Sequence, residues 1–279
     1  MTKQNSKTSQ ASGLADAFQS LKNKPATKWT AIGVIAVIII VGGFFAYKQF
    51  VVKPADEKAQ TQLTLGIQLM NQAQQISAQN AQVQSMPDST LASALRAQGM
   101  LTTDSADSIA SFVKQFREDQ QAQVTNTFNK ALKGDGTFPG FVKLSKGSGD
   151  AANMATYLAG IAYYYIGQYK EAIKYLEDYS PQGDSGVSPM ALSALANCYA
   201  CDKQIDKAIS TFKDAADEAD NESISPICLL EAGKLLESQN KKAEANAIYE
   251  QIKRDYPNFG LTRQGMTSSE VDLYIERTK

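Results

Sequence analysis

Two closely spaced cysteines are the first residues whose types could do chemistry. Cys198 and Cys201 form a C-x-x-C pair, the spacing found in thiol–disulfide oxidoreductases. In a thioredoxin-like site the first cysteine lies at a helix N-terminus after a strand, which lowers its pKa. Both cysteines instead fall late in an expected helix, so buried thiols or a structural disulfide are favoured over a redox role. Cys228 makes the number of cysteines odd, which argues against a fixed disulfide framework.

Histidine is absent from the 279-residue chain. This excludes Ser-His-Asp and Cys-His nucleophiles, His-ligated zinc and His-ligated haem. Three cysteines are also too few for a four-thiolate zinc site. The chain has 28 basic and 29 acidic residues, so it lacks the positive charge that nucleic acid binding requires. We therefore expect no metal, no cofactor and no nucleic acid partner.

A glycine-rich stretch at residues 133–140 is the next candidate for a ligand site. A phosphate cradle requires the pattern G-x-x-x-x-G-K-[ST] after a strand, and no strand is evident there. The stretch also lacks the later acidic ligands of an EF-hand, so it predicts a turn between helical hairpins. Carboxylates such as Glu222 and Glu231 have no apolar neighbours that would raise their pKa. With no catalytic constellation in view, we expect a protein that is not an enzyme.

Residues 29–47 contain no charged side chain and predict a membrane span. As a helix they measure about 28 Å, close to the hydrocarbon thickness of a bilayer. Lysines flank the stretch, and Trp29 and Tyr47 lie at the interfacial positions. A cleaved signal peptide would have a shorter apolar core and a small-x-small cleavage site. We therefore expect an uncleaved transmembrane signal anchor over residues 29–52.

The polar tail at residues 1–28 bears on the orientation of this anchor. It contains five lysines and one aspartate, but the basic residues close to the two ends of the span are equal in number. The local charge rule therefore does not decide the orientation. The basic tail as a whole favours a cytoplasmic N-terminus, with the rest of the chain in a bacterial periplasm. The expected location is thus the inner (cytoplasmic) membrane, crossed once.

An internal repeat organises the C-terminal half. Segments that begin at Val187 and Ile224, 37 residues apart, both start with a Ser-Pro pair. The serine predicts an N-cap, and proline fits the first helical turn because its missing N–H costs nothing there. Each segment predicts two helices with a polar break, at residues 202–204 and 240–242. A third copy begins near Ala152.

Small and large residues recur at matching positions of the three copies. The small ones predict close helix approaches, and they are Gly160, Ala172, Ala196, Ala208, Gly233 and Ala245. In this pattern the copies resemble the tetratricopeptide repeat, a helix-turn-helix unit of 34 residues that stacks into a solenoid. We expect three repeats within residues 151–262, at about 152–185, 188–222 and 225–258. A plain helical bundle is the alternative.

Helical patterns also flank the repeats. Residues 53–150 predict a degenerate first hairpin, with helices near 55–79 and 105–133. Between them, an insertion near 80–104 contains Pro87 and Gly99 and is expected to be irregular. Residues 263–279 predict a C-terminal capping helix after a capping-box pattern. The predicted fold class is all-α, with one N-terminal transmembrane helix followed by a tetratricopeptide-repeat α-solenoid.

The first helix of each pair is expected to line the concave face of such a solenoid. Aromatic side chains with a polar tip suit extended or partly unfolded peptides. Packing of the tyrosines against the preceding hairpin is an equal alternative. The second and third copies also place Met190, Ser193 and Ile227 on this face. The predicted peptide- or partner-binding groove consists of Met154, Tyr157, Ile161, Tyr164, Tyr165, Asn197, Leu230 and Lys234.

The architecture as a whole resembles a known family. A basic tail, one span and a short exported repeat domain are similar to the YfgM-like ancillary subunits of the SecYEG translocon. Residues 128–144 (FNKALKGDGTFPGFVKL) and 156–177 (TYLAGIAYYYIGQYKEAIKYLE) resemble their Bacteroidetes form. The resemblance does not extend to the insertion near 80–104.

This resemblance implies a chaperone-like helper at the translocon. The helper would receive emerging secretory proteins together with a PpiD-like chaperone. The alternative function is an assembly scaffold for another cell-envelope complex, in cytochrome maturation or in cell-wall or outer-membrane biogenesis. A scaffold would have one folded partner instead of many unfolded ones.

Overall fold

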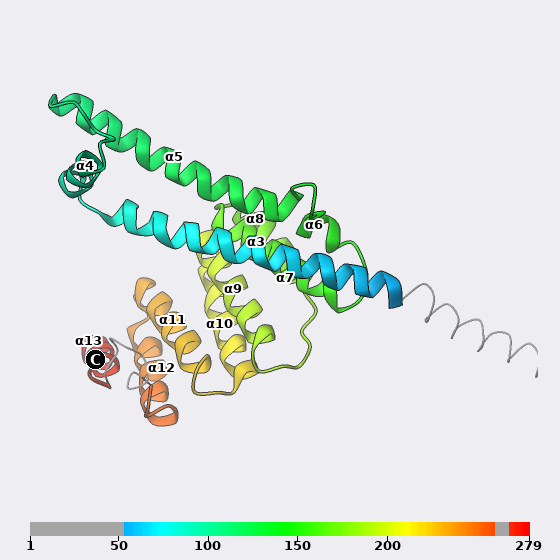
Figure 1. Cartoon of the computed structure of the whole chain (residues 1–279). Coiled ribbons are helices and arrows are strands. Elements are labelled where there is room, and N and C mark those ends of the chain that lie inside the picture. Colours follow the sequence, from blue (N-terminus) through cyan, green and yellow to red (C-terminus); the bar gives the residue numbers. More distant parts are fainter. Residues whose placement is uncertain (1–52, 260–267) are drawn as a thin grey trace, which may run out of the picture. The chain divides into compact units, whose positions relative to one another are not determined.

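The computed structural model describes residues 53–259 and 268–279, and every element in these ranges is a helix (Figure 1). The predicted tail at residues 1–28 and the predicted anchor at 29–52 lie outside the described residues. Within the part of the chain that is described, no helix combines the length and apolarity needed to span a bilayer. Residues Ala59–Lys279 form one compact unit.

Two long helices begin this unit and run antiparallel. They are α3 (Lys53–Ser85) and α5 (Ala106–Lys133). The Asn80 amide donates to Gln121 Oε1 at 2.7 Å, and the Gln84 amide donates to the Arg117 carbonyl at 3.1 Å. One face of α3 is buried because its small and apolar residues recur at helical spacing, and these are Leu63, Gly66, Met70 and Ala73.

Helix α4 (Asp88–Ala97) connects the two long helices. Much of the segment near 80–104, which the sequence predicts to be irregular, is therefore helical, and α3 continues to Ser85. The reason is a small separate core in which Leu91 and Leu95 of α4 pack with Leu101 and Val113. The proline and glycine that suggest a break stand at the two ends of α4, with Gly99 at φ +72° just after it.

The glycine-rich stretch forms the predicted turn and leads into α6 (Phe141–Leu144). Asp135 Oδ1 accepts hydrogen bonds from the backbone N–H groups of Thr137 and Phe138, each at 3.0 Å. The rings of Phe138 and Phe141 lie beneath α3, where a Cβ on Gly66 would be 2.6 Å from both. The turn therefore positions two buried rings.

Three helix pairs follow, with bounds close to those predicted. They are α7 (Asp150–Tyr165) with α8 (Tyr169–Glu177), α9 (Val187–Cys201) with α10 (Ile205–Ala219), and α11 (Ser225–Ser238) with α12 (Lys242–Asp255). The turns place Gly167, Lys203 and Asn240 at equivalent positions, with φ of 74°, 66° and 61°. Close approach explains the small residues, since a Cβ on Gly233 would lie 2.4 Å from the Tyr249 ring.

The predicted serine caps of α9 and α11 are wrong. Ser188 and Ser225 lie within the first turns and are fully buried. Ser188 Oγ accepts from the Gln182 N–H of the preceding loop, and the Ser225 hydroxyl donates to the Ala216 carbonyl of α10. Residues four positions earlier accept the backbone N–H groups at the helix starts. Asp184 Oδ1 accepts from Gly186 and Val187, and the side-chain Oδ1 of Asn221 accepts from Ser223 and Ile224, just before α11.

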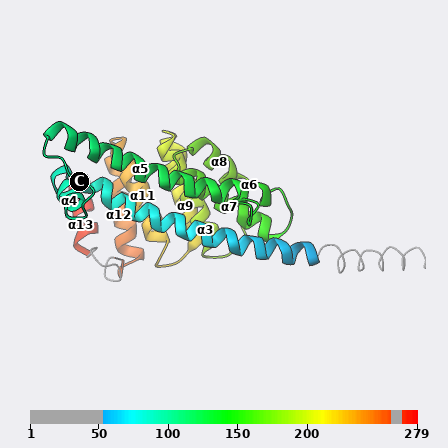
Figure 2. The same cartoon turned by 45° about the horizontal axis from the view of Figure 1, so that its top comes forward.

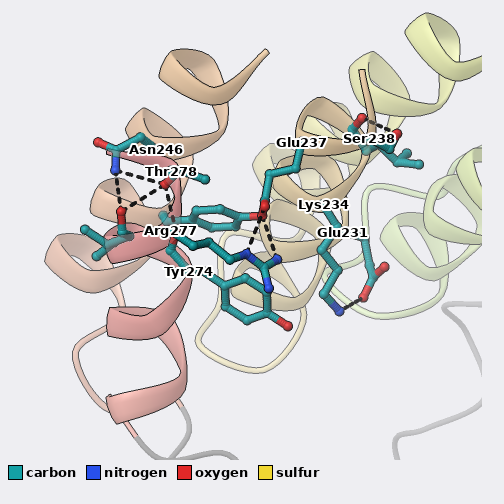
Figure 3. Close-up of polar contacts among 11 residues, drawn as sticks. Glu231, Lys234, Glu237, Ser238, Asn246, Tyr274, Arg277 and Thr278 are labelled. Atoms are coloured by element: carbon teal, nitrogen blue, oxygen red, sulfur yellow. Dashed lines mark hydrogen bonds and ion pairs between the residues drawn. The ribbon is translucent and has the colours of Figure 1, made fainter. Parts of the chain in front are cut away.

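Helix α13 (Ser268–Thr278) is the predicted C-terminal helix, and it packs against α12 (Figure 2). Val271 and Ile275 are buried in the core formed by the last two helix pairs. Polar contacts also hold it, among them those between Arg277 and Glu237 and between Asn246 and Thr278 (Figure 3). The helix thus covers an apolar surface at the end of the stack, as terminal repeats require.

Candidate functional site

A cavity of about 410 Å³ lies where the first helices of the three pairs meet α3. Helix α7 contributes four residues and α9 another four, and the start of α11 and one residue of α3 complete the lining. Figure 2 shows α3 passing along α7 and α9. The lining consists of Gln74, Tyr157, Ile161, Tyr164, Tyr165, Met190, Ser193, Ala194, Asn197, Ile224, Ile227 and Cys228.

The structure brings five of the eight predicted groove residues together at this cavity. They are Tyr157, Ile161, Tyr164, Tyr165 and Asn197, and the groove-facing positions Met190, Ser193 and Ile227 join them. Their spacing of three and four residues on α7 and α9 puts them on one helix face. The first-helix positions of the first two repeats thus converge as the repeat pattern implies.

The other three predicted residues do not line the cavity. Met154 packs against the core shared by α3, α5, α6 and α7. Leu230 is only 2% exposed and belongs to the core of the last two pairs. Lys234 Nζ lies 2.8 Å from Glu231 Oε1 and faces the Tyr274 ring of α13 at 6.0 Å (Figure 3). The cavity reaches the start of α11 and ends before Leu230 and Lys234.

Four lining residues are not predicted from the sequence, and these are Gln74, Ala194, Ile224 and Cys228. Three belong to α9 or to the start of α11, next to positions that the repeat alignment does indicate. Gln74 comes from α3, outside the repeats. It directly follows the buried Ala73, but no sequence signal indicates which repeat helices this part of α3 meets.

The tyrosines of α7 both line the cavity and pack against other elements. The Tyr165 ring stacks on that of Phe128 in α5, with centroids 4.8 Å apart and planes 8° from parallel. The Tyr164 ring meets Tyr165 edge-on at 5.8 Å, and Tyr157 contacts Tyr179 at the same distance. Tyr165 is nevertheless 38% exposed. The tyrosines of α7 therefore pack against neighbouring elements and also line the cavity.

The electrostatics of the cavity are neutral. Among the described residues no charged side chain lines it, and its polar groups are amides, hydroxyls and the Cys228 thiol. Burial raises the pKa of Tyr157 and Tyr164, so their hydroxyls stay protonated near neutral pH. The cavity can therefore offer hydrogen bonds and apolar contact, but it presents no charge and no activated nucleophile.

The C-x-x-C pair lacks the features of a redox site. Cys198 is buried, and this burial raises its pKa to about 12, whereas a reactive cysteine has a lowered pKa. Cys201 is exposed, and all three thiols are free. Cys228 is also buried, and burial raises its pKa. The interpretation of Cys198 as a small buried side chain fits this geometry.

A second cavity, of about 720 Å³, lies at the far end of α3 and α5. Its charged residues are paired with one another. Arg117 Nη1 lies 2.6 Å from Asp88 Oδ1, and Lys114 Nζ lies 3.9 Å from Glu118 Oε1. The remaining lining is mixed polar and apolar, so nothing in this cavity selects a class of ligand.

Comparison with known proteins identifies the repeats. The tetratricopeptide repeat family matches residues 154–180 and 228–258, which correspond to the α7–α8 and α11–α12 pairs. No curated protein matches the chain. A crystal structure of BtubC (BKLC) from P. vanneervenii is similar over 79% of this chain and 82% of that one, at 13% identity and a TM-score of 0.39. A likeness at that TM-score carries no argument about function.

The α9–α10 pair lies between the two matched segments and repeats their turn and their buried small residues. Domains of this family are typically non-catalytic modules that contact other proteins. Every element in the described part of the chain is a helix, and two of its three helix pairs match the tetratricopeptide repeat, a unit that indicates a protein-binding scaffold.

Proposed function

We propose that this protein is a membrane-anchored, non-enzymatic helper that holds emerging or partly unfolded secretory proteins beside the Sec translocon. The observation that carries the proposal is the neutral, tyrosine-lined cavity where α7, α9 and α11 meet α3. The apolar stretch at residues 29–47 and the resemblance to YfgM-like subunits supply the membrane context.

The chemistry of the cavity suits unfolded chains better than one folded partner. Tyrosine offers a large, rigid contact area at low entropic cost, and its hydroxyl can bond to a peptide backbone. Contacts of this type do not demand a particular sequence. An extended segment of many different clients could therefore bind with modest affinity and leave again.

The membrane anchor compensates for this modest affinity. In the proposed topology the tail is cytoplasmic, one helix crosses the inner membrane, and the repeats face the periplasm. A tether keeps the cavity near the exit of the translocon, which raises the effective concentration of the emerging chain. SecYEG and a PpiD-like chaperone are the proposed neighbours.

In-cell photo-crosslinking tests the proposal. A photoreactive amino acid replaces Met190, which lines the cavity and is 51% exposed, so the change disturbs little packing. The matched control places it at Leu273 of α13, which is 66% exposed and does not line this cavity. We expect position 190, and not position 273, to crosslink to translocon subunits and to nascent secretory chains.

The same experiment addresses the alternative function. Recovery of a single folded complex in fixed stoichiometry from position 190 would contradict the proposal and favour an assembly scaffold for another cell-envelope complex. Equal crosslinking of secretory chains from both positions would show that the cavity has no special part in binding them.

A further inference from the structure

Gln74 gives the cavity a polar wall that does not belong to the repeats. It lies on α3, half-buried, opposite the side chains of α7, α9 and α11. Among the residues that the structure describes, its amide has no hydrogen-bond partner. A polar group at the edge of a mostly apolar cavity is costly to desolvate without a partner.

Other polar groups of the lining also lack hydrogen-bond partners among the described residues. Asn197 donates through Nδ2 to the Ser193 carbonyl at 2.9 Å, but its side-chain oxygen has no partner among the described residues. The hydroxyls of Tyr157, Tyr164 and Tyr165 are likewise unpartnered there. The cavity therefore has several neutral donors and acceptors that remain free for a ligand.

The amides of Gln74 and Asn197 match the chemistry of a peptide backbone. A side-chain amide both donates and accepts, as every peptide unit does. An extended segment that enters an apolar site must pair its backbone N–H and C=O groups. Two amides on opposite walls can meet this need without reading the sequence of the segment.

Charge complementarity limits which segments fit. In the part of the chain that the structure describes, no aspartate, glutamate, lysine or arginine lines the cavity, so a charged side chain that enters it loses its hydration and meets no opposite charge there. Uncharged apolar and aromatic side chains meet Ile161, Ile227 and the tyrosine rings.

Resting on the proposed function, we infer that the cavity binds a short extended peptide segment whose side chains are uncharged, and that Gln74 of α3 is a specificity-determining residue of this site. Helix α3 thereby turns an open repeat surface into a two-walled slot that rejects charged residues. Because the selection depends on a neutral lining, a single negative charge placed on the α3 wall should cancel the preference for the neutral peptide over the lysine peptide.

Fluorescence anisotropy on the full chain in detergent tests this inference. The probes are three labelled peptides with Gly-Ser flanks and a central Leu-Tyr-Leu, Leu-Lys-Leu or Leu-Glu-Leu. We expect the neutral peptide to bind about tenfold more tightly than either charged one. In Gln74→Glu, the neutral peptide should bind more weakly and the lysine peptide more tightly than in the wild type, a change of about tenfold in their ratio.

Two matched variants complete the design. Gln75→Glu places the same charge on the neighbouring exposed position of α3, outside the lining, and should leave all three affinities unchanged. Asn197→Asp charges the opposite wall and should also favour the lysine peptide. Circular dichroism at the binding temperature confirms that each variant keeps its helices.

The outcomes separate this inference from the proposed function. If the wild type binds charged and neutral peptides equally, or if Gln74→Glu behaves like Gln75→Glu, the inference is overturned while peptide binding stands. If the wild type binds none of the three peptides, the proposed function fails and the inference fails with it.

Discussion

Glu237 of α11 joins α13 through Arg277. Its carboxylate accepts two hydrogen bonds from Arg277, at 2.8 and 2.9 Å, and another from the Tyr249 hydroxyl (Figure 3). Arg277 also lies over the Tyr274 ring, 4.2 Å from its centroid. Burial opposes ionisation, but the bonds from Arg277 and Tyr249 prevail and lower the pKa of Glu237 below its usual 4.5.

Glu237→Gln should therefore destabilise the protein by about 1–2 kcal/mol at pH 7, since the variant loses charge-assisted bonds at a mostly covered site. Because the folded pKa is lowered, the contribution of Glu237 is complete above its unfolded pKa and is lost as the pH falls through the folded pKa. Urea unfolding of the wild type and of Glu237→Gln at several pH values measures this loss of stability.

Glu231→Gln, which removes an exposed ion pair with Lys234, is the control and should cost under about 0.5 kcal/mol. A Glu237→Gln effect that does not fade in acid would contradict the electrostatic explanation.

Gly233 shows how one missing methyl group determines a helix contact. A Cβ there would lie 2.4 Å from Cε1 of Tyr249, whose side chain is fully buried and cannot move aside. Gly233→Ala should cost about 1–3 kcal/mol through overpacking, in spite of the better helix propensity of alanine. Thermal unfolding, monitored by circular dichroism, measures this loss of stability. Gly186→Ala, where the nearest atom is 3.4 Å away, is the control; equal losses in the two variants would rule out the steric explanation.

Loop side chains, more than residues of the helices themselves, determine where α9 and α11 begin. Asp184 accepts backbone N–H groups at the start of α9, and Asn221 accepts those of Ser223 and Ile224, just before α11. The Asn221 amide also donates to the Ser185 carbonyl at 3.1 Å, which joins successive loops. Four hydrogen bonds, one from the Ser188 hydroxyl and three from the backbone N–H groups of Gly186, Val187 and Ser188, outweigh the desolvation of Asp184 and lower its pKa.

Replacing Asp184 or Asn221 by alanine should lower the free energy of unfolding, because backbone N–H groups at the helix starts lose their acceptors. The exposed Ser223→Ala, which keeps the backbone N–H that Asn221 accepts, should cost little. Chemical denaturation of the three variants measures the differences. A loss of stability in Ser188→Ala and Ser225→Ala, with no loss in the Asp184 and Asn221 variants, would contradict this prediction and support capping by the serines.

At the scale of the whole described unit, the apolar core is divided into four clusters along the chain. The cluster around Leu95 at the α3–α5 tip is separate from the clusters of the helix pairs. Repeat proteins transmit destabilisation mainly between neighbours, because each element contacts only those next to it. The tip, which consists of α4 and the adjoining ends of α3 and α5, should therefore unfold locally while the helix pairs stay folded.

Leu95→Ala should remove hydrogen-exchange protection from α4 and the adjoining ends of α3 and α5, since a cavity in a small core costs about 2–5 kcal/mol. Protection in α11 and α12 should stay unchanged. Leu195→Ala, in the cluster of α8, α9 and α10, is the matched variant and should lower protection in the helix pairs and spare the tip. Uniform loss of protection in Leu95→Ala would mean that the unit unfolds as a single cooperative block.

The sequence by itself determines the helices of this protein and most of their ends. Apolar spacing, small residues at close approaches and polar breaks act within one or two turns, so the helix pairs and the turns at Gly167, Lys203 and Asn240 follow from local patterns. The same patterns indicate five cavity residues on α7 and α9, because a repeat assigns a face to each first helix.

Only the tertiary structure decides how these helices close a binding site. Contacts between positions far apart in sequence put Gln74 in the cavity, bring Lys234 to the Tyr274 ring, and give α4 a core of its own. The predicted serine caps fail because Ser188 and Ser225 are buried, while Asp184 and Asn221, a few residues earlier, accept the backbone N–H groups. Periodicity reports which face of a helix is buried, but it does not report which partner covers that face, because partner choice depends on packing between elements that share no local sequence signal.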